Sequence, residues 1–184
     1  GRARTVWGKA AGESVALDTD RYTIMEMSMT NTVQARHFLP GDGKIHKLGR
    51  STLRFKTTAE HNSGAYTLCE AIEPPAAGAG LHRHPTWDET FIICEGRYEF
   101  QIDGKTLDLG PGDVLFVPRG TPHGFMSIGP EVGRQLIISS PGGIFDVFIA
   151  EAAASKVDSG SPSRPGVATD FRAIAAKYGV EFLS

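Results

Sequence analysis

Between residues 51 and 140 the chain is a succession of short runs rich in β-branched and aromatic residues. The runs are separated by turn-forming segments such as PPAAGAG, DGK, GPGD, RGTP and GPEVG. Short runs at regular spacing, with no helical period among them, are typical of antiparallel sandwiches and barrels. Asp103-Gly104 joins two runs and predicts a tight hairpin, because that turn needs positive φ at both central residues. We therefore expect an all-β barrel over residues 51–140.

The segment before the barrel, residues 1–50, has no comparable pattern. It contains a strand-like run at 21–30 and a turn signal at 40–44, with the sequence PGDGK. We expect this segment to be an extension, including strands, that packs on the barrel.

The segment after the barrel, residues 141–184, changes to a helical period. Two apolar stripes predict two helices, separated by a loop at about 155–168, and Gly179 is the expected end of the second helix. Thr169 or Asp170 is the expected cap of that second helix. We expect the stripes to dock on the barrel or on a second subunit. Their members are Ile144, Phe145, Phe148, Ile149 and Ala152 in the first, and Phe171, Ile174, Ala175 and Tyr178 in the second.

Composition excludes several classes of protein. Apolar residues make up 40% of the 184 residues and charged residues 22%, a mixture typical of a globular domain. The net charge of −2 and the lack of a basic block argue against a nucleic-acid partner. The sequence has no apolar run long enough to cross a bilayer, so we expect no membrane partner. Cys69 and Cys94 lie in separate strand-like runs, and we interpret them as reduced, buried thiols of a cytoplasmic protein.

The stretch GLHRHPTWDET, residues 80–90, carries the first candidate functional residues. Side chains two apart point to the same face of a strand, so His82 and His84 are expected to face the barrel interior together. Glu89 begins the next run and can return beside them. Two imidazoles and a carboxylate at one point are suitable ligands for a first-row divalent metal. His123, after the RGTP turn, is a fourth candidate ligand if its strand neighbours the others.

The spacing of these residues resembles the two motifs of the cupin superfamily. His82, His84, Glu89 and Gly96 resemble the first motif, and the run from Gly112 through Pro118 and Gly120 to His123 resembles the second. Two positions depart from the pattern: Ala76 and Ser127 stand where the motifs usually have glycine and asparagine. The resemblance implies a cupin β-barrel, the jelly roll also described as a double-stranded β-helix, over roughly residues 50–150. It also implies a metal bound by the three histidines and Glu89.

Segments after the barrel resemble single-domain bacterial cupins of the quercetin 2,3-dioxygenase-like group. This resemblance implies a dioxygenase acting on a phenolic or enolic small molecule, with Glu89 taking the substrate's proton. Glu89 is therefore our candidate catalytic residue, and we expect the apolar barrel to raise its pKa so that it serves as both ligand and base. The metal can be Fe, Mn, Ni, Co or Zn, with iron a leading choice. Non-redox isomerase, cyclase or lyase chemistry, and ligand binding without turnover, are the alternatives.

The remaining expectations concern the surroundings of the metal. A small, aromatic substrate is expected to lie against barrel side chains, whose candidates are Phe91, Tyr98, Phe100, Phe116, Phe125 and Ser127. The four aromatic members after Phe91 are expected mainly in the barrel core. Trp87 is interpreted as a lid or packing residue, and Asp88 as an outward carboxylate, solvated or paired with a cation such as Arg83. Unpaired sheet edges and terminal helices favour a homodimer.

Overall fold

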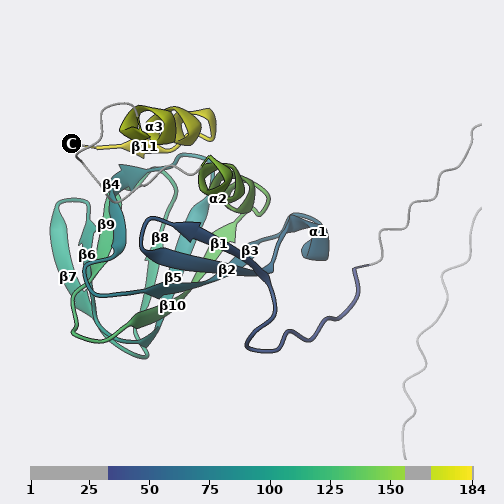
Figure 1. Cartoon of the computed structure of the whole chain (residues 1–184), viewed down its shortest axis with the longest axis horizontal. Helices are drawn as coiled ribbons and strands as arrows, with labels where there is room; N and C mark the ends of the chain where they lie inside the picture. Colours follow the sequence, from purple (N-terminus) through teal and green to yellow (C-terminus); the bar gives the residue numbers. More distant parts are fainter. Residues whose placement is uncertain (1–32, 156–166, 184) are drawn as a thin grey trace, which may run out of the picture. The chain divides into compact units, whose positions relative to one another are not determined.

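The computed structural model describes residues 33–155 and 167–183. Strands dominate this part of the chain, and helices lie mainly after them (Figure 1). The predicted strand at 21–30 lies outside the described residues, as does most of the predicted loop at 155–168. The elements are β1 (Lys44–Leu48), β2 (Ser51–Thr57), α1 (Ala59–Asn62), β3 (Thr67–Glu73), β4 (Gly78–Arg83), β5 (Asp88–Glu95), β6 (Tyr98–Ile102), β7 (Lys105–Leu109), β8 (Val114–Val117), β9 (His123–Ser127), β10 (Gly133–Ser140), α2 (Phe145–Ala154), α3 (Val167–Lys177) and β11 (Glu181–Phe182).

The strands form two antiparallel sheets. Sheet A has six strands in the order β1-β2-β3-β10-β5-β8, and sheet B has five in the order β11-β4-β9-β6-β7. From β3 to β10 the chain passes back and forth between the two sheets, which is the winding of a double-stranded β-helix. The all-β class and the barrel architecture predicted from the sequence are therefore confirmed. β1 lies within the predicted extension and forms an edge of sheet A, beside β2.

The turns and strand faces follow from the local sequence. The hairpin between β6 and β7 turns at Asp103 and Gly104, with φ of 47° and 77°, as the sequence predicts. On β5 the residues Glu89, Phe91 and Ile93 are buried, and their neighbours along the strand are more exposed. This alternation places every second side chain between the sheets and makes that space the core.

Two C-terminal helices cover one end of the barrel (Figure 1). The predicted stripe of α2 is buried, with Phe145, Phe148, Ile149 and Ala152 all within the core. On α3 the predicted stripe also packs on this core, and Gly179, with φ of 78°, follows the end of the helix. α3 begins at Val167, before the expected cap. Both stripes pack on the core of the same chain, which is the first of the two docking sites that the sequence left open.

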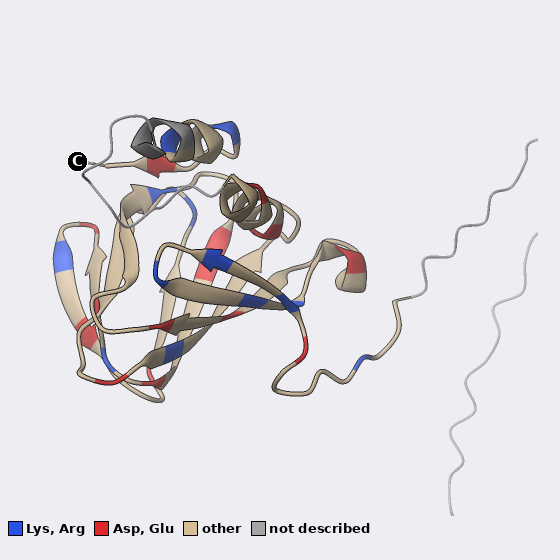
Figure 2. Ribbon diagram, viewed as in Figure 1, with Lys and Arg blue, Asp and Glu red and all other residues tan. Residues whose placement is uncertain are grey.

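Charged side chains are interspersed over the described strands (Figure 2). Ion pairs join neighbouring strands, including Arg54 to Glu70 at 2.8 Å and Arg134 to Glu95 at 2.6 Å. Pairs of this kind on a protein surface contribute little to stability, about 0–1 kcal/mol each. The described helices include none that is both long and apolar enough to span a bilayer.

Candidate metal centre and cavity

The four predicted ligands meet between the two sheets. His82 lies near the end of β4 and His84 directly follows that strand, whereas Glu89 comes from the start of β5 and His123 from the start of β9. β4 and β9 are paired, with His82 opposite His123, so the two motifs lie side by side. One nitrogen or oxygen atom from each of the four residues lies within 4.8 Å of the others. The arrangement expected from spacing and strand alternation is therefore present.

The histidines are held with one ring nitrogen facing the centre of the cluster. Each Nδ1 donates to a backbone carbonyl: that of Gly80 for His82 at 2.8 Å, and those of Trp87 and Thr121 for His84 and His123, both at 2.9 Å. These bonds put a hydrogen on Nδ1, so a neutral ring turns the lone pair of Nε2 toward the centre of the cluster, whereas a protonated ring donates from Nε2 to Glu89. Lone pairs and a carboxylate that converge on one point can together coordinate a cation. The donor set therefore fits a divalent transition metal.

Glu89 accepts hydrogen bonds through both of its carboxylate oxygens. Oε2 lies 3.2 Å from Nε2 of His84 and 3.1 Å from Nε2 of His123. Burial acts to raise the pKa of Glu89, but the hydrogen bonds and charges of His123 and His84 outweigh it and hold the pKa below its ordinary value. The expectation of a raised pKa was wrong, because it counted the apolar barrel and left out the imidazoles.

The histidines differ in their electrostatics. Burial, with the neighbouring His123, lowers the pKa of His82 to about 4, so this ring is neutral at ordinary pH. Burial acts to lower the pKa of His123 also, but its bond to Glu89 raises the pKa above the ordinary value. His123 therefore stabilises the carboxylate as a proton donor when no metal lies between them. His82 is the partly exposed member of the cluster, and it lines a cavity.

Trp87 supports the cluster in a way that the sequence did not indicate. Its ring stacks on His84, with centroids 4.0 Å apart and planes 5° from parallel, and its Nε1 donates to Oε1 of Glu89 at 3.2 Å. Ser139 on β10 lies 3.5 Å from the same oxygen. Trp87 is buried, as expected of a packing residue, but it also orients two of the candidate ligands. The one sequence feature related to this role is that Trp87 stands two residues before Glu89, since side chains two apart point to the same face of a strand.

The outward face of the same stretch forms ion pairs. Asp88 points away from the cluster, as predicted, and accepts bonds from Nε and Nη2 of Arg119 at 3.0 and 2.8 Å. These bonds lower the pKa of Asp88 to about 2. Arg83 instead pairs with Glu181 on β11, at 2.7 Å. Asp88 is therefore paired with a cation, as expected, but the cation is Arg119 and not Arg83.

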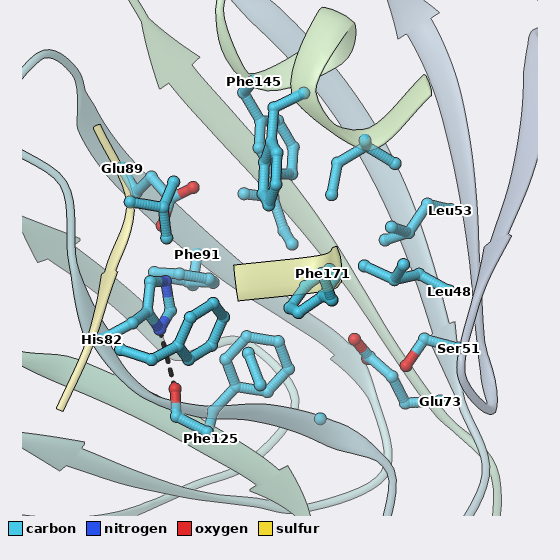
Figure 3. Close-up of a pocket in the computed structure, with 18 of the residues that line it drawn as sticks. Leu48, Ser51, Leu53, Glu73, His82, Glu89, Phe91, Phe125, Phe145 and Phe171 are labelled. Atoms are coloured by element: carbon cyan, nitrogen blue, oxygen red, sulfur yellow. Dashed lines mark hydrogen bonds between the residues drawn. The ribbon is translucent and has the colours of Figure 1, made fainter. Parts of the chain in front are cut away.

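A cavity of about 140 Å³ adjoins the cluster (Figure 3). This space is roughly ten times what a single water molecule needs. His82, Trp87 and Glu89 lie on its wall, so a ligand in the cavity would meet the cluster from their side. The other side chains on the wall are mostly apolar or aromatic. They are Leu48, Leu53, Phe91, Phe125, Ile137, Phe145, Phe148, Ile149, Phe171, Val180 and Phe182, together with Ser51 and Glu73.

The six predicted pocket residues fall into three groups. Phe91 and Phe125 line the cavity. Tyr98, Phe100 and Ser127 are fully buried behind its wall. Phe116 is 60% exposed, so its expected place in the core was wrong. It lies on the outer face of β8 because its neighbour Val117 pairs with Glu89, which faces inward.

Much of the aromatic wall comes from the C-terminal segment instead. Phe145 and Phe148 of α2, Phe171 of α3 and Phe182 of β11 all line the cavity. Their helical spacing was recognised in the sequence, but a stripe of apolar residues does not show what it covers. Glu73 at the end of β3 is a further lining residue, and no sequence motif indicated it.

The turn before β4 explains one departure from the cupin pattern. Ala76 has a φ of 61°, in the left-handed region that favours glycine. The turn therefore has a conformation that glycine adopts at no steric cost, although this chain has alanine there.

Residues 70–139 match the family described as "Cupin domain". With the double-stranded β-helix and the two motifs, this match shows that these residues form a cupin domain. A solved structure with the same fold is KdgF from Halomonas sp., with a TM-score of 0.54 and 17% identity over 60% of this chain and 96% of that one.

Three curated proteins are similar in sequence. An uncharacterised protein of Methanocaldococcus jannaschii is 36% identical over 41% of this chain and 60% of its own length. Polyketide synthase CurC of Streptomyces cyaneus is 33% identical over 49% of this chain and 57% of its own. Quercetin 2,3-dioxygenase of Bacillus subtilis is 28% identical over 46% of this chain and 25% of its own. The similarity thus spans about six-tenths or less of each relative.

Proposed function

We propose that this protein is a metal-dependent enzyme acting on a small hydroxylated aromatic or enolic molecule. The observation that carries the proposal is the three-histidine, one-carboxylate cluster beside a cavity with aromatic walls. Four protein ligands leave one or two positions open on an octahedral metal, and His82 and Glu89 are the ligands on the cavity wall.

A divalent metal held by His82, His84, Glu89 and His123 would supply Lewis-acid polarisation and, with Fe, Mn, Ni or Co, redox chemistry. The remaining work belongs to the chain. Phe91 and Phe125 would hold the ring of the substrate, while Phe145 and Phe148 would keep water from it. Glu89 would take the proton of the substrate hydroxyl, with Trp87 fixing Oε1 by its hydrogen bond.

Dioxygenation is the reaction we favour. It is supported by the sequence similarity to a protein named quercetin 2,3-dioxygenase and by an aromatic cavity suited to a phenolic ring. Non-redox cyclisation, isomerisation or lyase chemistry is the second candidate. The observation that favours it is the similarity to polyketide synthase CurC, over a longer part of this chain and at higher identity.

Metal analysis and oxygen uptake separate the two candidates. We expect the purified protein to hold about one Fe, Mn, Ni or Co per chain and to consume oxygen with at least one of a panel of flavonols and catechols. Failure of every reconstituted metal to support oxygen uptake would exclude dioxygenation. Conversion of a panel compound without oxygen uptake would support the second candidate, and binding without conversion would make the protein a ligand-binding cupin.

The catalytic role of Glu89 has its own test. Glu89→Gln is expected to abolish turnover while metal remains bound, because the amide cannot take a proton. Asp88→Asn is the matched control, since Asp88 is adjacent and points away from the cluster. Unchanged turnover in Glu89→Gln would remove the base role and leave only a ligand role.

We also propose that the protein forms a homodimer through the outer face of β8. Val114 and Phe116 are 62% and 60% exposed there, on an edge strand of sheet A. Such an edge favours pairing with a second copy. Light scattering after size exclusion should give a dimer, and Phe116→Ser should give a monomer. A monomeric wild type would refute the proposal.

A further inference from the structure

A second carboxyl group, Glu73, lies on the opposite side of the cavity from the metal cluster. In Figure 3 Glu73 and Ser51 are on one side of the cavity, and Glu89 and His82 are on the other. Glu73 ends β3 with its side chain between the sheets, and only 1% of the residue is exposed. The cavity therefore has a polar group at each end and apolar walls between them.

The partners of Glu73 are all uncharged. Oε2 accepts a hydrogen bond from the hydroxyl of Tyr98 at 2.6 Å, and Nε2 of Gln135 lies 3.3 Å from both carboxylate oxygens. Among the described residues, no Lys, Arg or His forms an ion pair with it. Oε1 thus receives only the long bond from Gln135, and it retains capacity to accept another.

Such a carboxyl is costly for a purely structural role. Burial raises the pKa of Glu73 to about 7, even though the bonds from Tyr98 and Gln135 lower it. A buried carboxyl without a cationic partner is more typical of a functional site than of a core. Because Glu73 lines the cavity, a ligand there could contact its carboxyl group directly.

We propose that Glu73 is a specificity-determining residue that binds a hydroxyl group at the end of the substrate opposite its metal-binding group. This rests on the proposed function, and it defines the substrate as an elongated aromatic compound with polar groups at both ends. A hydroxyl donates one hydrogen bond and accepts another. Glu73 would accept the first and the hydroxyl of Ser51 would donate the second. An ammonium group fits this end less well than a hydroxyl, because it has three hydrogen-bond donors. Glu73 and Ser51 are the only polar side chains on this end of the wall among the described residues, so they cannot satisfy all three donors.

Paired ligands of two lengths test the proposal. One pair is phenylcatechol and its para-hydroxyphenyl analogue, and the other is a naphthalene catechol with and without a hydroxyl on the second ring. Each compound is titrated calorimetrically into the metal-loaded protein without oxygen. In the wild type the added hydroxyl is expected to tighten Kd about tenfold in at least one pair, as for a hydrogen bond to a charged group.

Variants assign this preference to Glu73. Glu73→Gln should reduce the preference to within about twofold, and Ser51→Ala should reduce it to about threefold. Glu70→Gln is the matched control and should retain the preference for the added hydroxyl. It makes the same chemical change on the same strand, but on the outer face, away from the cavity. Should Glu73→Gln not fold, Ser51→Ala still decides. A preference absent from the wild type, or unchanged in both pocket variants, would overturn the proposal.

Oxygen uptake measured in parallel separates the two hypotheses. A preference that depends on Glu73, without oxygen uptake, would reject dioxygenation and keep the distal hydroxyl site. Oxygen uptake without any preference would keep dioxygenation and reject the site.

Discussion

Two buried glutamates, Glu89 and Glu73, lie at opposite ends of one cavity and have opposite electrostatics. The pKa of Glu89 is held below its ordinary value by two imidazoles, whereas burial among uncharged partners raises the pKa of Glu73 to about 7. Burial is common to both residues, so the neighbours decide the sign of each shift. One end of the cavity is therefore suited to a cation and the other to a neutral hydrogen-bonding group.

Removing a histidine from the metal end should have the largest effect. His84→Ala deletes a ligand and the partner of both Glu89 and Trp87, so metal affinity should fall by more than roughly 100-fold. Competition with a chelator measures this affinity, and circular dichroism checks the fold. His61→Ala is the control, because His61 lies outside the cluster and bonds to Thr58. Stoichiometric, tight metal in His84→Ala would show that the cluster is not the metal site.

The carboxyl group of Glu73, at the distal end of the cavity, should make the free energy of unfolding depend on pH. The pKa of Glu73 is about 7 in the folded protein, whereas its ordinary value is 4.5, so the folded state binds more protons than the unfolded state between those values. Its contribution to stability is therefore most favourable below pH 4.5 and falls as pH rises through 7. Glu73→Gln removes this loss, and its stability relative to wild type should increase by roughly 2–3 kcal/mol between pH 5 and pH 8.

Urea unfolding at several pH values measures that change. The titratable neighbours of Glu73 are Tyr98 and Cys69, and burial raises the pKa of both, so they stay protonated throughout this range. Glu70→Gln, on the outer face of β3, should give no comparable trend. Parallel pH profiles for wild type and Glu73→Gln would mean that the two ends of the cavity do not differ as described.

Removing the hydrogen-bond donors to Glu89 and Glu73 should have a smaller effect. Trp87→Phe keeps a ring beside His84 but removes the bond to Oε1 of Glu89, and metal affinity should fall about 10–100-fold. Tyr98→Phe removes the equivalent bond to Glu73 and should leave metal affinity within about twofold. Both are measured by chelator competition. Equal losses in the two variants would indicate a general effect of destabilising the barrel.

The metal end could be predicted from sequence because its signals are local. His82 and His84 share a strand face, and the spacing to Glu89 and His123 matches two motifs. The inward position of Glu89 and the outward position of Asp88 then follow from alternation along β5. The supporting partners are harder to predict, because Arg119 is 31 residues from Asp88 in the chain.

The distal end could not be predicted because its residues come together only through packing. Glu73, Tyr98 and Gln135 belong to three strands and to no single motif. Phe116 shows a related difficulty: it lies in the four-residue apolar run VLFV, where alternation of polar and apolar residues gives no face. The pairing of β8 with β5 decides the face, and the sequence does not show that register.

The turn between β3 and β4 connects the two ends of the cavity and allows the finest test. β3 ends at Glu73, β4 leads to His82, and Ala76 lies between them with a φ of 61°. A left-handed conformation costs a non-glycine residue about 1–2 kcal/mol, partly offset by the greater freedom of glycine in the unfolded chain. Ala76→Gly should therefore stabilise the protein by about 0.5–1 kcal/mol.

Thermal and urea unfolding measure this gain in stability. The same protein preparations show whether metal binding and the distal hydroxyl site are affected by the turn. Metal affinity and preference for the distal hydroxyl should both stay within about twofold of wild type, because the backbone path is unchanged. Ala77→Gly is the control and should be destabilising, since Ala77 is buried and has no positive φ. A loss of stability in Ala76→Gly would mean that the turn does not hold the left-handed conformation.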